Sequence, residues 1–108
     1  MSPPPQIRVI VGEDQPFVRE GIVHVLRDAG FDVVGAAADA RDLVRMAHVD
    51  SPDLVIADIQ MPPDHADDGL RAALQIRAAQ PGTGVLVLSQ FLEDSYVFDL
   101  ADGAQGVG

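Results

Sequence analysis

The stretch LVIADIQMPPDHADDG, residues 54 to 69, contains an apolar run that ends on an acid. Four apolar residues lead directly into Asp58, and a loop rich in Pro and Asp follows. An ionised carboxylate in a buried position costs several kcal/mol unless a partner compensates for the lost water. Asp58 is therefore either a polar residue that ends a strand or a group with a chemical role.

Three other short segments of the chain are also apolar runs, and they are rich in β-branched residues. Because apolar residues occupy successive positions, the runs indicate strands that are buried on both faces. The predicted strands are residues 7 to 12, 31 to 37, 54 to 58 and 84 to 89.

Longer segments with helical periodicity separate these runs. In the first segment, Val18, Ile22 and Val25 follow the spacing of one helix face. Pro16 suits the first turn of this helix, and Gly30 suits its C-terminal end. The predicted helices are residues 16 to 29, 40 to 49 behind Asp39 as N-cap, 67 to 79, and 93 to 102.

Strictly alternating strands and helices predict a single α/β domain. Its core would be a doubly wound parallel sheet, with helices on both faces and right-handed crossovers between the strands. We expect residues 7 to 108 to form this domain and residues 1 to 6 to be a flexible N-terminal tail.

Three acidic residues stand at the carboxyl ends of predicted strands, where such sheets bind their ligands. Glu13 and Asp14 follow the first strand, and Asp58 ends the third. If these strands are neighbours the carboxylates converge, and two unit charges about 4 Å apart repel by about 4 kcal/mol at an effective dielectric constant of about 20. The cluster must then hold a proton or bind a cation, and oxygen ligands favour Mg²⁺ over Zn²⁺.

The composition narrows the classes of function. The chain has 108 residues, no Cys and a formal net charge of −10. Disulfides and thiolate metal sites are therefore excluded, and an acidic surface repels nucleic-acid phosphates, so this segment alone should not bind DNA. No apolar run is long enough to cross a membrane. We expect a cytoplasmic protein with no membrane partner.

Four motifs, in order along nearly the whole chain, resemble the receiver domains of two-component response regulators. They are the acidic pair Glu13-Asp14, VIADIQMP around Asp58, DDGL at residues 67 to 70 and VLVLS ending in Ser89. The segments GEDQPFVREGI and LADGAQGVG are most similar to the NarL/LuxR-type subfamily. The resemblance implies a flavodoxin-like (CheY-like) sheet with the strand order 2-1-3-4-5.

The resemblance also implies a function. A cognate sensor histidine kinase would transfer a phosphoryl group from its phosphohistidine to Asp58, assisted by Mg²⁺. The modified domain would form a homodimer or switch an output domain, usually a C-terminal helix-turn-helix, and only that absent domain would bind DNA. Such a receiver assists its own phosphorylation and dephosphorylation but is not an enzyme with a separate substrate.

The residues of the acidic loops and of the fourth strand have distinct roles in this scheme. Asp58 would be the nucleophile and, with Asp14, a direct metal ligand. Glu13 would act partly through water, and Gln60 would offer its backbone carbonyl. Ser89 would donate its hydroxyl to a phosphoryl oxygen and act as the switch residue.

The sequence departs from the family pattern in one place. Receivers carry a Lys after a fifth strand, where it pairs with the phosphoryl group, and this chain contains no Lys. By the family pattern, residues 106 to 108 would open that strand. We therefore expect a receiver that is truncated at its C-terminal end, with strand five and the last helix missing or incomplete.

Other interpretations of the acids remain open. Asp58 alone could be a structural strand end. A phosphorylation-independent interaction module on the same fold would tolerate the missing Lys, but it would not need three converging acids. A small Mg²⁺-dependent phosphohydrolase could use a similar Asp, but it would need a second acid or base and a substrate pocket, which the sequence does not indicate.

Overall fold

In the part of the chain that the structure describes, four parallel strands form the sheet, in the order β2-β1-β3-β4. The computed structural model describes residues 6 to 62 and 67 to 88. The strands are β1 (Arg8–Gly12), β2 (Asp32–Ala37), β3 (Leu54–Asp58) and β4 (Gly84–Leu88). The predicted order of the first four strands is thereby confirmed. A fifth strand and the helix predicted at residues 93 to 102 fall outside the described residues.

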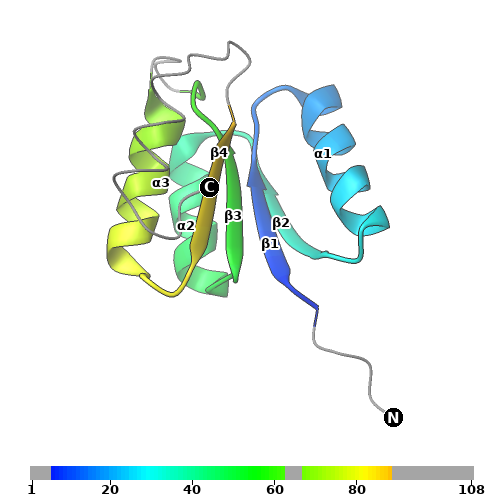
Figure 1. Ribbon diagram of the computed structural model, residues 1–108. Helices are drawn as coiled ribbons and strands as arrows, with labels where there is room; N and C mark the ends of the chain where they lie inside the picture. Colours follow the sequence, from blue (N-terminus) through cyan, green and yellow to red (C-terminus); the bar gives the residue numbers. More distant parts are fainter. Residues whose placement is uncertain (1–5, 63–66, 89–108) are drawn as a thin grey trace.

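Three helices connect the strands and cover both faces of the sheet. Helix α1 (Pro16–Asp28) lies on one face, and α2 (Ala40–Asp50) and α3 (Asp68–Ala79) lie on the other (Figure 1). From β1 the chain moves outward to β2, then crosses back past β1 to β3 and β4. Because each crossover is right-handed, this reversal of direction places α1 opposite α2 and α3. The doubly wound fold class is confirmed.

Local sequence signals explain where the helices begin and end. Pro16 occupies the first turn of α1, and Gly30 follows the helix with a φ of 93°, in the left-handed region that glycine adopts readily. Asp39 caps α2 by accepting a hydrogen bond from the amide of Asp42 at 2.7 Å. Ser51 ends α2 with a φ of 45°. The predicted Asp39 cap is present.

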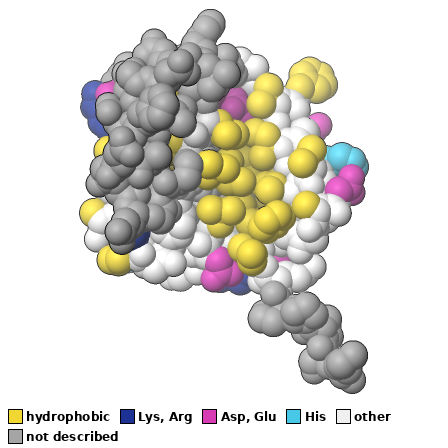
Figure 2. All heavy atoms as spheres, in the orientation of Figure 1, with side chains coloured by type: hydrophobic (Ala, Val, Ile, Leu, Met, Phe, Trp, Pro, Cys, Tyr) yellow, Lys and Arg dark blue, Asp and Glu magenta, His cyan; other side chains and the backbone are white. Residues whose placement is uncertain are grey.

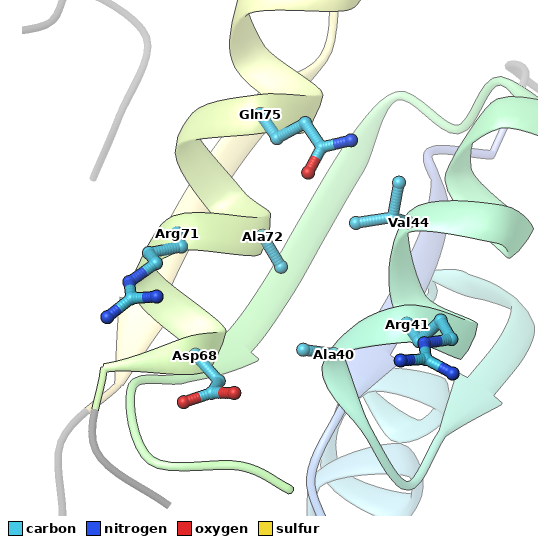
Figure 3. A pocket seen from close by; sticks show the side chains of 7 residues that line it. All are labelled: Ala40, Arg41, Val44, Asp68, Arg71, Ala72 and Gln75. Carbon is cyan, nitrogen blue, oxygen red and sulfur yellow. The ribbon is translucent and has the colours of Figure 1, made fainter. Parts of the chain in front are cut away.

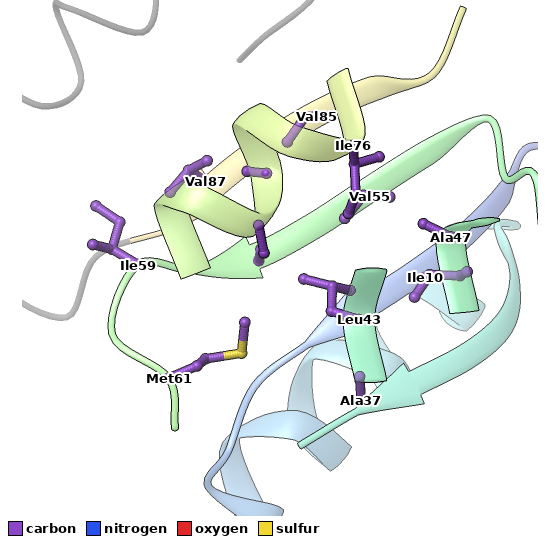
Figure 4. Packing of buried hydrophobic residues seen from close by; sticks show 13 residues of the cluster. Ile10, Ala37, Leu43, Ala47, Val55, Ile59, Met61, Ile76, Val85 and Val87 are labelled. Atoms are coloured by element: carbon purple, nitrogen blue, oxygen red, sulfur yellow. The ribbon is translucent and has the colours of Figure 1, made fainter. Parts of the chain in front are cut away.

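The main hydrophobic core lies between the sheet and the pair α2 and α3 (Figure 4). Leu43 of α2 and Met61, which follows β3, are completely buried there beside strand residues such as Ile10 and Val55. Close packing on this face fixes both helices against the strand ends that carry the acids.

The opposite face has a smaller core and an open apolar groove. Val9, Val11 and Ile56 are buried beneath α1, but none of the residues of α1 itself is buried. The predicted apolar stripe of α1 instead lines a groove of about 430 Å³ between α1 and strands β3 and β4, and Val25 remains 64% exposed. Figure 2 shows the hydrophobic side chains gathered on this face.

None of the described helices combines the length and the apolar character needed to cross a bilayer.

Candidate functional site

The fold brings three acids together at one edge of the sheet. Strands β1 and β3 are parallel neighbours, with Gly12 opposite Ala57. Glu13 and Asp14 directly follow β1 and Asp58 ends β3, so their side chains meet at the carboxyl ends of the two strands. One carboxylate oxygen from each acid lies within 4.8 Å of those from the other two. The three acids therefore form one cluster, although they come from two distant segments of the chain.

Burial sets the electrostatics of this acidic cluster. Glu13 is 2% exposed and Asp58 is 5% exposed, whereas Asp14 is half-buried. The pKa of Glu13 is raised from 4.5 to about 7, mainly by loss of water, with smaller contributions from the charge of Asp58 and from hydrogen bonds with Asp58 and Asp14. A hydrogen bond from the Gln15 amide to Glu13 Oε1 opposes the rise. Near neutral pH the cluster therefore holds a proton that a cation can replace.

The loop between β1 and α1 is fixed by hydrogen bonds at both ends. The amide of Glu13 donates to the carbonyl of Ala37 on β2 at 2.9 Å. The Arg19 guanidinium donates to the carbonyl of Glu13 at 2.8 Å and to that of Asp14 at 3.4 Å. The sequence pattern does not single out Arg19, because its partners are backbone carbonyls. The signal that it offers is its position five residues after Asp14.

The loop after β3 is held just as closely. The amide of Gln60 donates to Asp58 Oδ1 at 3.2 Å and so limits the rotation of that carboxylate. The amide of Gly69 donates to the carbonyl of Ile59 at 2.8 Å and joins the start of α3 to the end of β3. The sequence indicates Gly69 as part of a helix start but does not predict this contact with the site.

The structure places four of the five predicted site residues. Glu13, Asp14 and Asp58 converge, and exposed Gln60 lies beside Asp58 through its amide. Their roles, including that of the Gln60 carbonyl, stay predictions. Ser89 lies outside the described residues.

The chemistry and spacing of the cluster fit Mg²⁺. Among the described residues its donors are all carboxylate oxygens, which hard divalent cations prefer. Opposite ligands of one Mg²⁺ lie about 4.2 Å apart, because each bond is about 2.1 Å long. An oxygen separation of up to 4.8 Å therefore suits direct binding by some of the acids and binding through a water by another.

A separate pocket of about 300 Å³ lies between α2 and α3 (Figure 3). Its lining is Ala40, Arg41, Val44, Asp68, Arg71, Ala72 and Gln75, so none of the three clustered acids borders it. Figure 3 shows Ala40 and Ala72 pointing toward each other across this pocket. The pocket therefore lies on the face covered by α2 and α3, and the acidic cluster lies at the carboxyl ends of the strands.

Comparison with known proteins identifies the family. The family model for the response regulator receiver domain matches residues 9–107. The chain is 37% identical over 103 residues to the uncharacterized transcriptional regulatory protein YxjL of Bacillus subtilis, covering 94% of this chain and 46% of that protein. It thus spans about half the length of the curated relatives it matches.

Solved structures agree with this match. The signal receiver domain of NarL from Mycobacterium tuberculosis superimposes with a TM-score of 0.81 at 34% identity, covering 96% of this chain and 83% of that one. The CheX–CheY–BeF₃–Mg²⁺ complex from Borrelia burgdorferi gives a TM-score of 0.78 at 25% identity, covering 94% of this chain and 75% of that one. The chain belongs to the response regulator receiver domain family.

Proposed function

We propose that Asp58 accepts a phosphoryl group from the phosphohistidine of a sensor histidine kinase, with Mg²⁺ bound at the acidic cluster. The observation that carries this proposal is the position of Asp58, buried at the end of β3, with the carboxylates of Glu13 and Asp14 close to its own. A structural strand end would not need two further acids from a neighbouring strand. The interaction-module alternative leaves this convergence unexplained.

The residues of the chain would divide the chemistry between them. An oxygen of Asp58 attacks phosphorus, and the new O–P bond forms as the P–N bond to the kinase histidine breaks. The imidazole nitrogen leaves with the electron pair and can take up a proton. The Gln60 amide, bound to Asp58 Oδ1, holds the attacking carboxylate in one orientation. Because catalysis of phosphoryl transfer is mostly positioning and charge stabilisation, this restraint favours the reaction.

The metal would be held by the oxygen atoms of the site. Asp14 and Asp58 would bind directly, Glu13 partly through water, and Gln60 through its backbone carbonyl. When bound, Mg²⁺ would neutralise charge on the cluster and on the phosphoryl oxygens. The presence of Mg²⁺ and BeF₃ in the related CheX–CheY complex supports this assignment. Ser89 would donate a hydrogen bond to the phosphoryl group; this proposal rests on its place in the sequence directly after β4.

The wider role follows from the relatives, which are named as transcriptional regulatory proteins. Phosphorylation of this domain, which we place at residues 7 to 108, would act in the cytoplasm on an output domain that binds DNA, directly or through a homodimer. The chain would modify its own Asp58 and would not turn over a separate substrate.

A small phosphoryl donor tests the assignment of Asp58. Incubation of a chain extended through the Lys of the family pattern with acetyl phosphate and Mg²⁺ should add the mass of one phosphoryl group, because the donor supplies its own reactive bond and needs no kinase surface. Asp58→Asn should fold and stay unmodified. Asp32→Asn, at the opposite end of the sheet, is the matched control and should be modified normally. An unmodified extended parent chain, or a phosphorylated Asp58→Asn variant, would contradict the proposal.

A further inference from the structure

Arg19 donates hydrogen bonds to the carbonyls of three consecutive residues in the loop that carries the acidic pair. Its guanidinium Nη1 lies 2.8 Å from the carbonyl oxygen of Glu13 and 3.4 Å from that of Asp14. Its backbone amide donates to the carbonyl of Gln15 at 2.9 Å. The hydrogen bond from the amide is the ordinary helical bond that any residue at this position would make, so the half-buried Arg19 side chain itself holds the carbonyls of Glu13 and Asp14.

These bonds act on the part of the chain that must resist electrostatic repulsion. The carboxylates of Glu13 and Asp14 face that of Asp58, and like charges at this spacing repel. Other restraints on the loop include the Glu13 amide, bound to Ala37, and the Glu13 side chain, bound by the Gln15 amide. Arg19 adds charge-assisted bonds at the carbonyls, which are stronger than bonds between neutral groups.

We propose that Arg19 is a positioning residue for the acidic cluster. It would fix the backbone of residues 13 and 14 so that the Glu13 and Asp14 carboxylates stay oriented toward Asp58. The inference rests on the proposed function, because orientation of these acids matters for the binding of Mg²⁺. Partners in the second layer of a metal site typically contribute roughly ten- to a hundredfold to its affinity.

Replacement of Arg19 should change the Mg²⁺ affinity in opposite directions, depending on whether its restraint on the loop or its positive charge matters more. A positive side chain near the cluster repels Mg²⁺, so loss of its charge alone should tighten metal binding. Loss of its restraint on the loop should weaken metal binding. The sign of the change in affinity therefore separates the two contributions.

Arg27 provides a matched control. It lies on the same helix, and Arg19 and Arg27 border the same pocket of about 320 Å³ beside β2. Arg27→Met removes the same charge and leaves the three bonds of Arg19 to the acidic loop in place. Arg19→Lys keeps the charge but replaces the planar guanidinium with a single ammonium group.

The experiment compares the wild-type chain with Arg19→Met, Arg19→Lys and Arg27→Met. Titration calorimetry measures Mg²⁺ affinity, and amide hydrogen exchange in the metal-free protein measures restraint at Glu13 and Gln15. We expect Arg19→Met to bind Mg²⁺ roughly tenfold more weakly and to exchange both amides faster. Arg19→Lys should be intermediate in both measurements, and it replaces Arg19→Met if the latter does not fold. Arg27→Met should match the wild type or bind slightly more tightly.

The two measurements separate this inference from the function on which it rests. If the wild type binds Mg²⁺ and Arg19→Met binds it equally or more tightly, the positioning role is wrong. Unchanged exchange at Glu13 and Gln15 in Arg19→Met also overturns it. If the wild type binds no Mg²⁺, the proposed metal site is wrong, and the exchange rates still decide whether Arg19 holds the loop.

Discussion

Gly69 and Asp58 are in such close contact that a Cβ atom on residue 69 would lie 1.6 Å from the carbonyl oxygen of Asp58. The amide of Gly69 also donates to the carbonyl of Ile59 at 2.8 Å. Helix α3 therefore begins directly against the backbone of the candidate phosphoacceptor. A displacement of this helix start would be transmitted to Asp58 without an intervening side chain.

Replacement of Gly69 by Ala should destabilise the fold. The added methyl group overlaps rigid backbone, so α3 and the end of β3 must separate, and overpacking of this kind costs about 1–3 kcal/mol or more. Urea unfolding measures the loss. Gly21→Ala is the control, because Gly21 lies within α1 and its Cβ would meet nothing within 4 Å. That variant should gain up to about 1 kcal/mol, since Ala favours helix over Gly. Equal stability of the two variants would refute the close contact.

Mg²⁺ should stabilise the native protein, because the acidic cluster exists only in the folded state. A ligand at ten times its dissociation constant raises the free energy of unfolding by about 1.4 kcal/mol. Thermal unfolding with and without millimolar MgCl₂ measures this effect. Asp14→Asn should abolish the increment, and Asp32→Asn, on the far end of β2, should retain it. An unchanged melting temperature in the wild type would show that the cluster binds no Mg²⁺.

Because the pKa of Glu13 is raised, the free energy of unfolding of the metal-free protein should fall as pH rises. Burial raises this pKa from 4.5 to about 7, so between these values the folded state binds more protons than the unfolded state. The free energy of unfolding then decreases with pH across this window, by an amount on the order of 3 kcal/mol from this group. Below about pH 4.5 Glu13 is protonated in both states and contributes no slope.

Glu13→Gln isolates that contribution. The neutral amide has nearly the same shape and does not titrate, so the variant should be more stable than the wild type at pH 8 and similar to it at pH 4. Urea unfolding at several pH values, without metal, provides the comparison. The difference between the two proteins should appear mainly between pH 5 and 7; a difference independent of pH would point to a packing effect instead.

The N-cap of α2 provides a test of whether Asp39 stabilises the helix through its hydrogen bond. Asp39 Oδ1 accepts the Asp42 amide at 2.7 Å, and loss of such a cap costs about 1 kcal/mol. Asp39→Ala should therefore lower the free energy of unfolding by that amount. Asp39→Asn keeps an oxygen in place and should be nearly neutral. If both variants lose the same stability, the negative charge matters more than the hydrogen bond.

Much of the fold could be predicted because its local signals agree with one another. Pro16 and Gly30 bound α1, Asp39 starts α2, and the apolar run before Asp58 is β3, as its pattern indicates. The convergence of the acids could be anticipated as well, because the carboxyl ends of neighbouring parallel strands share one edge of the sheet. These inferences need only periodicity, capping and the handedness of crossovers.

Contacts that depend on how the helices pack against the strand ends could not be predicted in this way. The reach of Arg19 to the Glu13 carbonyl depends on where α1 packs, and the contact of Gly69 with Asp58 depends on the exact approach of α3. Periodicity shows which side of a helix is apolar but not how fully it is covered, so the exposure of Val25 was not evident. The role of Ser89 stays a prediction.

The parallel pairing of β1 with β3 also has a kinetic consequence. Glu13 and Asp58 come from segments separated by α1, β2 and α2, so the acidic cluster forms only after a large loop has closed. Helices can form earlier from local contacts, whereas this strand pair needs contacts between distant segments. The rate at which Mg²⁺ binds during refolding would therefore report when β1 and β3 pair, separately from the rate at which helices form.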